Sequence, residues 1–376
     1  MRVLIVSAWE PWRQGDGACL VLHAHLRELA GRHDLDVLTA GAARTRATPP
    51  PNLPAPVRWY GRTLPQAADA LWRRAARGAE PAHVGYVARA ALVTDLKGAI
   101  REQRPDVVHL FGWGTAALWP HLDGVPTVHD AVDPWAANLD NRTVGGAHGL
   151  LDRGEAQRVA AHEARHYPHL SAVVVRTEQD AELLRRQVPT ATVAVVPNGV
   201  DAGPVPAPPS REPVLAFLGS YDAEANVDAA ERLVHDVLPQ LPGARVLLIG
   251  RDPSPRVLAL AGSQVEVTGS VPDVGSALAR AAVFVAPITR GRGVRNKVLE
   301  AMAAGLPVVG TSLALQGIGP SRGVIEAETP GEQASAARRL LSDPGAGPAN
   351  RARVLSRHTW ARSATILEEL WCASRS

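Results

Sequence analysis

The segment ITRGRGVRNKVLEAMAAGLPVVG, residues 288–310, joins a cation-rich turn to an apolar helix and then to a short apolar strand. One stripe of this predicted helix carries only apolar side chains, namely Val294, Val298, Ala301 and Met302. Their spacing fits the helical period and predicts a face packed against a core. Gly305 supplies a helix stop, and LPVVG then reads as a buried strand.

The cations of this segment gather at the predicted N-terminus of the helix. Lys97 and Lys297 are the only lysines among 40 basic residues, so a lysine here is unusual in an arginine-rich chain. Helix N-termini favour anions, and the glycines at 291 and 293 would let a phosphate approach the backbone. Two interpretations are open at this point: a phosphate site, or a solvated polar face that includes Arg292, Asn296 and Glu300.

Composition bounds the class of protein. A chain of 376 residues is long enough for two domains with separate cores. Its net charge of +3 argues against a nucleic-acid-binding protein, and Cys19 and Cys372 give neither metal nor disulfide spacing. No signal-peptide pattern begins the sequence, and no segment approaches the ~20 apolar residues of a membrane span, so we expect a cytoplasmic protein.

Short apolar runs alternate with helical stretches along the chain. They are RVLIV, LDVLT, PVRWY, DVVHLF, VPTVHD, AVVVR and VAVVPN, then VLAFLG, RVLLIG, VEVTG, VFVAPI and LPVVG. This alternation predicts two doubly wound, Rossmann-like α/β domains, residues 1–200 and 201–356, joined by a Pro-rich linker at 201–213. Ligands in such sheets bind beyond the carboxyl ends of the strands, so we expect the site in the cleft between the domains.

Glycines follow the first predicted strand. Gly15 and Gly17 open a predicted helix that ends near Gly31, and Gly17 is either a point of close ligand approach or an ordinary helix start. The segment GDGACL lacks the third glycine of a dinucleotide fingerprint. The sequence contains no GxSxG, GxxxxGK[ST] or HExxH motif, so hydrolase and P-loop functions lack support and we expect no metal site.

Polar and aromatic side chains are predicted at the carboxyl ends of the first-half strands. His129 and Asp130 end the run VPTVHD, where they would face a substrate, although a histidine satisfied by its neighbours is the alternative. The remaining histidines, among them His25, His162 and His166, have spacings that suggest amphipathic helix surfaces. Four tryptophans after strand ends would offer flat faces to a sugar or an aromatic acceptor: Trp9, Trp12, Trp113 and Trp135. The arginines between residues 62 and 104 fit a solvated face better than an acidic membrane surface.

Taken together, these segments resemble a known family. The chain is similar to the retaining glycosyltransferases of the GT-B class, in family 4 ("glycosyl transferases group 1"). The resemblance extends over nearly the whole chain and rests on the Gly17 loop, the HD at 129–130, VVPNGVD at 195–201, FLGSYDAEANVDA at 217–229, VTGSVPD, and VLEAMAAGLPVV.

The resemblance implies a donor site in the second domain and an acceptor site in the first, with residues 357–376 crossing back to the first domain. Glu300 would hold the ribose hydroxyls, Gly269 and Val271 would border the base, and His129 would contact the donor sugar. The remaining expected contacts to the nucleotide-sugar are Gly17, Gly219, Ser220, Gly293, Val294, Asn296 and Lys297. Expected catalytic residues are His129, Asp130, Arg292 and Lys297.

The sequence departs from the family pattern in two places. The first acid of the family's Glu-x7-Glu motif is replaced by Arg292, and the usual Arg and Lys after the first strand of the second domain are missing from GSYDAEAN. A subset of the family shares this RG…NK…E variant. We expect Lys297, with Arg292 or Arg295, to neutralise the leaving diphosphate in place of the missing pair.

The expected reaction is therefore metal-independent transfer of a sugar from a UDP-, GDP- or dTDP-sugar to a small-molecule or glycan acceptor, by a monomer or a homodimer. The alternatives are a nucleotide-sugar epimerase and a non-catalytic nucleotide-sugar-binding protein of the same fold; a nicotinamide dehydrogenase would need the absent glycine fingerprint. The sequence leaves the base, the sugar, the acceptor and the type of glycosidic bond open.

Overall fold

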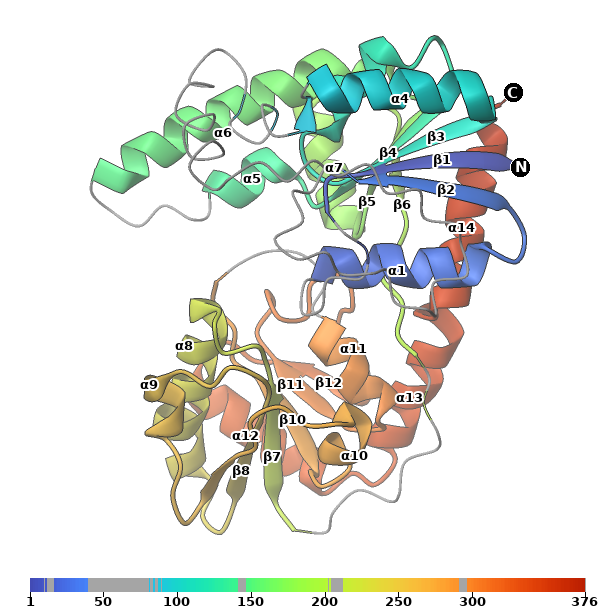
Figure 1. Cartoon of the computed structure of the whole chain (residues 1–376). Coiled ribbons are helices and arrows are strands. Elements are labelled where there is room, and N and C mark those ends of the chain that lie inside the picture. The colour runs from blue at the N-terminus through green and yellow to red at the C-terminus, as the bar shows by residue number, and fades with distance from the viewer. Residues whose placement is uncertain are drawn as a thin grey trace. The chain divides into compact units, whose positions relative to one another are not determined.

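The structure, a computed structural model, describes residues 1–9, 11, 17–39, 81, 84, 87–88, 90–140, 147–201, 203, 212–290 and 296–375. It divides the chain into two compact units, Met1–Pro197 with Ser363–Ser376, and Asn198–Arg362 (Figure 1). The predicted strand PVRWY and the expected site residues Trp12, Arg292, Gly293 and Val294 lie outside the described residues.

The first unit is a parallel sheet with the strand order β2-β1-β3-β4-β5-β6. Its strands are β1 (Arg2–Ser7), β2 (Asp34–Thr39), β3 (Val107–Phe111), β4 (Thr127–Val132), β5 (Ala172–Val175) and β6 (Val193–Val195). Its helices are α1 (Gly17–Leu29), α4 (Ala90–Gln103), η1 (Thr115–His121), α5 (Trp135–Asp140), α6 (Ala147–His166), η2 (Tyr167–His169), α7 (Glu178–Gln187) and most of α14 (Trp360–Ala373). Every described pairing is parallel, as the alternation of strands and helices predicts.

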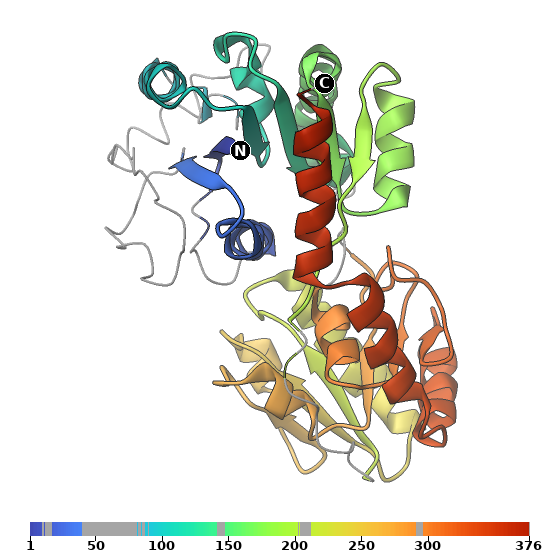
Figure 2. The same cartoon turned by 90° about the vertical axis from the view of Figure 1, so that its right-hand side faces the viewer.

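Both faces of the first sheet are covered, because side chains alternate between the faces along each strand. On one face, Ile5 and His109 pack against α1 and against Leu367 and Trp371 of α14, the helix that leads to the C-terminus (Figure 2). On the other face, Leu4 and Val6 belong to a core that includes side chains of α4 and α7. The return of α14 follows from its apolar side chains, since Trp371 is almost fully buried.

The second unit is also a parallel sheet, with the strand order β12-β11-β10-β7-β8-β9. Its strands are β7 (Val214–Leu218), β8 (Arg245–Ile249), β9 (Val265–Val267), β10 (Val283–Ala286), β11 (Val308–Gly310) and β12 (Val324–Glu326). Its helices are α8 (Glu224–Arg232), the π-helical turn η3 (Leu233–Val237), η4 (Leu238–Gln240), α9 (Pro255–Leu258), α10 (Val274–Leu278), α11 (Asn296–Ala303), α12 (Pro330–Leu341) and α13 (Ala346–Arg357).

Helices sandwich this second sheet as well. Helices α8 and α12 lie on one face, and α10, α11 and α13 lie on the other (Figure 1). The predicted apolar stripe of α11 is confirmed where it is described: Val298, Ala301 and Met302 are fully buried in the core. Gly305 adopts a φ of 77°, the left-handed conformation in which glycine ends a helix. Among the described helices, none combines the length and the apolarity needed to cross a membrane.

Candidate functional site

The strand order of the second unit places a ligand site before any side chain is considered. Strands β7 and β10 are neighbours, but the chain leaves them toward opposite edges of the sheet. Such a switch point opens a crevice beyond the carboxyl ends of the two strands, where ligands of doubly wound sheets bind. The turn after β7 carries Gly219 and Ser220, and the segment after β10 leads to α11 and Lys297.

Three expected nucleotide-binding residues lie at this end of the sheet: Gly219 after β7, and Gly269 and Val271 after β9. The turns that carry Gly219 and Gly269 both form hydrogen bonds with the end of β8 or the residue that follows it. The N–H of Gly219 donates to the carbonyl of Ile249, and the N–H of Gly250 donates to the carbonyl of Gly269. Gly250 has a φ of +148°, and a Cβ there would lie 1.7 Å from the Gly219 oxygen, so only glycine permits this approach. Val271, the next expected residue, is partly buried against the core of the unit. The carboxyl ends of β7, β8 and β9 therefore form one backbone-lined edge.

Lys297 reaches from the first turn of α11 to Asn226 at the start of α8, in the segment GSYDAEAN that follows β7. Its Nζ donates to Oδ1 of Asn226 at 2.5 Å and lies 4.9 Å from the centroid of the Phe217 ring, a cation–π contact. Asn226 in turn donates from Nδ2 to the carbonyl of Ser220 at 2.7 Å. The structure therefore brings Lys297 to the very segment whose usual cations are missing from the sequence.

Glu300 lies one helical turn beyond Lys297. Burial raises the pKa of its carboxyl, and the Lys297 ammonium acts in the opposite direction. Within the described part of the chain no side-chain hydrogen bond reaches this carboxyl. A recessed acceptor of this kind gains stability when a ligand supplies hydroxyl donors.

Asn296, the first residue of α11, is held by a residue that sequence reasoning did not single out. Nδ2 of Asn198 donates to Oδ1 of Asn296 at 2.8 Å, and Asn198 is only 6% exposed. Asn198 belongs to the segment VVPNGVD, which carries part of the family resemblance, so a signal for it was present.

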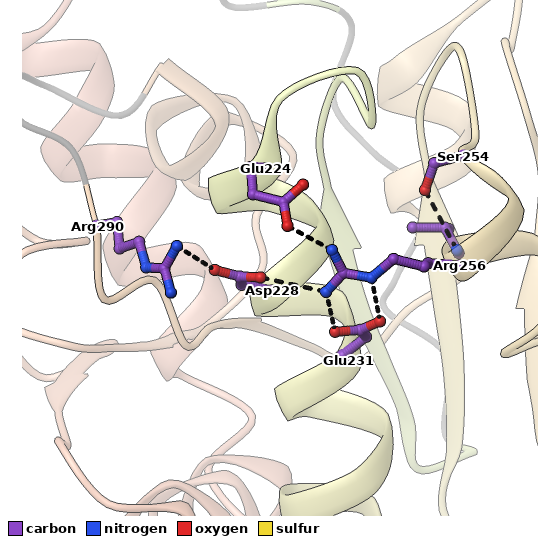
Figure 3. A network of polar contacts seen from close by, with 7 residues as sticks. Glu224, Asp228, Glu231, Ser254, Arg256 and Arg290 are labelled. Carbon is purple, nitrogen blue, oxygen red and sulfur yellow. Dashed lines mark hydrogen bonds and ion pairs between the residues drawn. The ribbon is translucent and has the colours of Figure 1, made fainter. Parts of the chain in front are cut away.

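Helix α8 also holds the segment that follows β10. Arg290 forms an ion pair with Asp228 of α8 at 3.2 Å, and Arg256 binds the same aspartate together with Glu224 and Glu231 (Figure 3). Arg256, Arg290 and Glu224 are exposed and Asp228 and Glu231 are partly exposed, so solvent screens the network and it contributes little to stability. Its effect is positional, because α8 contacts Arg290 through Asp228 and Lys297 through Asn226, on both sides of residues 291–295.

The first unit has a switch point of its own, between β1 and β3, and two of the expected tryptophans lie there. Trp9 follows β1 and Trp113 follows β3, and their rings meet edge to face at 5.8 Å. Gly112 has a φ of +94°, and a Cβ on it would lie 2.5 Å from the Trp9 ring, so the indole needs glycine beneath it. Both indoles are partly exposed, which leaves them able to contact a ligand.

Trp135 lies elsewhere than expected. Its ring stacks on Trp113 with a centroid distance of 5.8 Å, but the residue is 4% exposed and belongs to a small core with Ala136 and Val159. The reason is that Trp135 begins α5, whose first N–H group donates to the buried carboxyl of Glu163. Trp135 therefore supports Trp113 and does not present a face of its own.

His129 and Asp130, which the sequence expects to face a substrate, are buried in this structure. Both lie inside β4, which continues to Val132, and they are 1% and 0% exposed. Asp130 accepts from Arg176 at 2.5 Å and from the N–H of Val132 at 2.9 Å. A ring N–H of His129 bonds the carbonyl of Leu110, and Nδ1 lies 3.3 Å from Oγ1 of Thr115. Sequence reasoning missed Arg176, although it ends the run AVVVR.

Other histidines expected on amphipathic surfaces are also internal. His25, His162 and His166 are 2%, 2% and 8% exposed, because each lies on the buried side of its helix. Gly17 is the exposed first residue of α1. In the ranges that the structure describes, no group of three or more His, Cys, Asp or Glu side chains is arranged to hold a metal ion.

Two doubly wound units, one with a lysine and a recessed carboxylate at its switch point, define the class of two-domain, Rossmann-like α/β proteins. Residues 17–199 match the family described as "Glycosyl transferase 4-like domain", and residues 212–343 match "Glycosyl transferases group 1". Together these matches cover well over half of the chain. The chain belongs to the group 1 glycosyltransferase family, family 4 of the GT-B class.

Similar proteins agree with this placement. The phosphatidyl-myo-inositol mannosyltransferase of Mycobacterium tuberculosis is 32% identical over 133 residues, which are 31% of this chain and 34% of that protein. The match thus spans about a third of the length of this curated relative.

Solved structures match over almost the whole chain. Sucrose-phosphate synthase from Thermosynechococcus elongatus has a TM-score of 0.73 at 18% identity, covering 99% of this chain and 98% of that one. HepE of Anabaena in complex with UDP and glucose has a TM-score of 0.70 at 13% identity, covering 98% and 99%. Identities this low establish the common fold alone.

Proposed function

We propose that this protein is a retaining, metal-independent glycosyltransferase that moves a sugar from a nucleoside-diphosphate-sugar to a small-molecule or glycan acceptor in the cytoplasm. The second unit binds the donor, and the first unit binds the acceptor beside Trp9 and Trp113. The observation that carries the proposal is the contact of Lys297 with Asn226 and Phe217 at the β7–β10 switch point.

Charge supports a phosphate ligand at this place. Residues 219–228, which follow β7, contain Asp222, Glu224 and Asp228 and no cation, so an anion bound there needs a cation from elsewhere. Lys297 extends from α11 to Asn226 at the start of α8, next to this turn. A compact ammonium is well suited to a terminal phosphate.

The proposed chemistry follows from where charge develops. Breaking the anomeric bond leaves negative charge on the β-phosphate and positive charge on the sugar ring. A cation already fixed beside the β-phosphate stabilises this charge without a metal ion. Retention by a front-face reaction, in which the leaving phosphate assists deprotonation of the acceptor, is what the family resemblance implies for the step itself.

Glu300 supports the nucleoside end of the same donor. It lies one turn along α11 from Lys297, the spacing expected if one helix contacts both the ribose and the diphosphate. The solved relative HepE was crystallised with UDP and glucose, which makes UDP-sugars the first donors to test, before GDP- and dTDP-sugars.

The test is Lys297→Ala, with binding of nucleoside di- and monophosphates measured by calorimetry. We expect diphosphate affinity to fall roughly 10- to 100-fold, as for loss of a charge-assisted hydrogen bond, with monophosphate affinity nearly unchanged. The rate of donor hydrolysis should fall too, because the contact strengthens as charge grows in the transition state. The matched control is Lys97→Ala, which removes the exposed lysine of α4.

Equal, small losses for the two kinds of nucleotide would show that Lys297 is ordinary surface and would overturn the proposed phosphate site. All assays are run in EDTA, and activity that requires added Mg²⁺ or Mn²⁺ would overturn the metal-independent part. Conversion of a donor sugar into its epimer in the absence of an acceptor would favour the epimerase alternative.

A further inference from the structure

The chain passes between its two units at residues 197/198 and 362/363, and the second unit pairs these two passages. The N–H of Val200 donates to the carbonyl of His358 at 2.9 Å, and Val200 forms a parallel bridge with Thr359. Gly199 lies so close that a Cβ would be 2.4 Å from the nitrogen of Trp360. The start of the unit is thus tied tightly to its end.

From this paired segment, one side chain reaches the candidate phosphate site. Asn198 donates from Nδ2 to Oδ1 of Asn296 at 2.8 Å, and Asn296 directly precedes Lys297 at the start of α11. A side-chain contact to the first described residue of α11 helps to fix the direction of the first turn of that helix. The next contact along is that of Lys297 with Asn226.

The burial of Asn198 shows that core stability does not explain its presence. The residue is 6% exposed, and its Oδ1 receives no hydrogen bond from the described part of the chain. A buried amide oxygen left unpaired costs stability, which an apolar side chain of similar size would not. An asparagine is useful at this position for the one bond that it donates to Asn296.

We propose that Asn198 is a positioning residue for Lys297. Through Asn296 it fixes the first turn of α11. The Lys297 ammonium therefore keeps a constant position relative to the paired segments at residues 198–200 and 358–360. The inference rests on the proposed function, because it assigns Asn198 a purpose only if Lys297 binds the diphosphate.

The test is a double-mutant cycle of Asn198→Leu and Lys297→Ala, with calorimetry of nucleoside di- and monophosphates. Asn198→Leu alone should lower diphosphate affinity about 5- to 10-fold, the loss expected for one hydrogen bond, and leave monophosphate affinity within about twofold. In the Lys297→Ala background the same substitution should have no further effect, because residues that act through one another are not additive.

A full additional loss in the Lys297→Ala background, or equal losses for the two nucleotides, would overturn the positioning role. If Asn198→Leu does not fold, Asn296→Ala removes the same hydrogen bond from the partly exposed side and is put through the same cycle. The two proposals fail differently: an unselective Lys297→Ala overturns the phosphate site, whereas a selective Lys297→Ala with a silent Asn198→Leu overturns this inference alone.

Discussion

Two side chains one turn apart on α11 have opposite charges and different proposed ligands. Lys297 is one of only two lysines in the chain, and it contacts Asn226 at the start of α8. Glu300 is recessed, and burial raises the pKa of its carboxyl. The ammonium is placed for phosphate oxygens and the carboxyl for hydroxyl groups. Substitutions of the two residues should therefore change the affinities for nucleoside mono- and diphosphates in different ways, and calorimetry can measure this difference.

Glu300→Gln should weaken nucleoside mono- and diphosphate binding to the same extent, because both ligands carry the ribose. The expected cost is roughly 1.5–3 kcal/mol, or about 10- to 150-fold in affinity, since the hydrogen bonds to ribose lose their charge assistance. Calorimetry on the folded variant measures both affinities, with Glu326→Gln, an exposed carboxyl on β12, as the control. Unchanged affinity for either nucleotide would remove Glu300 from the ribose site.

At the scale of elements, the carboxyl end of β4 is held by an internal ion pair. Arg176, which follows β5, donates to Asp130 of β4 and to the carbonyl of Val196 after β6. The other oxygen of Asp130 accepts from Val132, a β-branched residue with a φ of +66°. A valine rarely adopts this conformation, so the ion pair offsets local strain where the chain turns toward Trp135.

Asp130→Ala should destabilise the first unit by about 3–5 kcal/mol, because it leaves the Arg176 guanidinium buried and unpaired. Urea denaturation followed by tryptophan fluorescence measures this loss. Replacing both partners, Asp130→Leu with Arg176→Met, should recover part of the stability, as in other buried ion pairs. A stable Asp130→Ala protein that lacks transfer activity would contradict this structural role and restore a catalytic one.

The parallel sheets could be predicted because each buried strand is encoded by one short apolar run of consecutive residues. RVLIV, DVVHLF and VLAFLG became β1, β3 and β7, since strands buried on both faces leave a continuous apolar signature. The edge strand β12 was missed, because only Val324 of its three residues is buried and the run is too short to stand out.

The candidate site was predictable in part, for a different reason. The sequence marks Lys297 and Glu300 through their helix, but contacts between distant segments have no local signature. Asn226 lies 71 residues from Lys297, and Arg176 lies 46 residues from Asp130. Without these partners, a histidine and an aspartate at a strand end resemble a substrate contact, whereas the fold makes them part of its interior.

At the scale of the whole molecule, both units are doubly wound parallel sheets, but they differ in strand order and in what they bury. In the first unit, burial lowers the pKa of His109, with Arg176 nearby, and that of His129, with His162 nearby, to about 3 in each case. The pKa of His25 is also lowered well below its usual value, again mainly by burial. Burial acts in the opposite direction on a carboxyl and raises the pKa of Glu163 to about 7.

These shifts determine the sign of the pH dependence. A histidine whose folded pKa is lowered contributes stability that is complete above the unfolded value of about 6.5 and is lost as the pH falls, by about 1.4 kcal/mol per pH unit for each group. Glu163, whose folded pKa is raised, contributes stability that is complete below an unfolded value of about 4.5 and is lost as the pH rises toward 7. Three histidines outweigh the two carboxyls whose pKa burial raises, Glu163 and Asp130, so the net slope favours neutral pH.

The first unit should therefore unfold at progressively lower urea concentration as the pH falls from 7.5 to 5. Tryptophan fluorescence reports this unit, because of the nine tryptophans only Trp360 lies outside residues 1–197 and 363–376. His109→Gln should reduce the slope of unfolding free energy against pH by the contribution of one proton, roughly 1.4 kcal/mol per pH unit below 6.5. The reason is that glutamine cannot bind the proton that histidine binds on unfolding. His235→Gln, at an exposed position of the second unit, is the matched control and should leave the slope unchanged. A urea midpoint that stays constant from pH 7.5 to 5, or an equal slope in the His109 variant, would mean that these histidines are not held neutral by the fold.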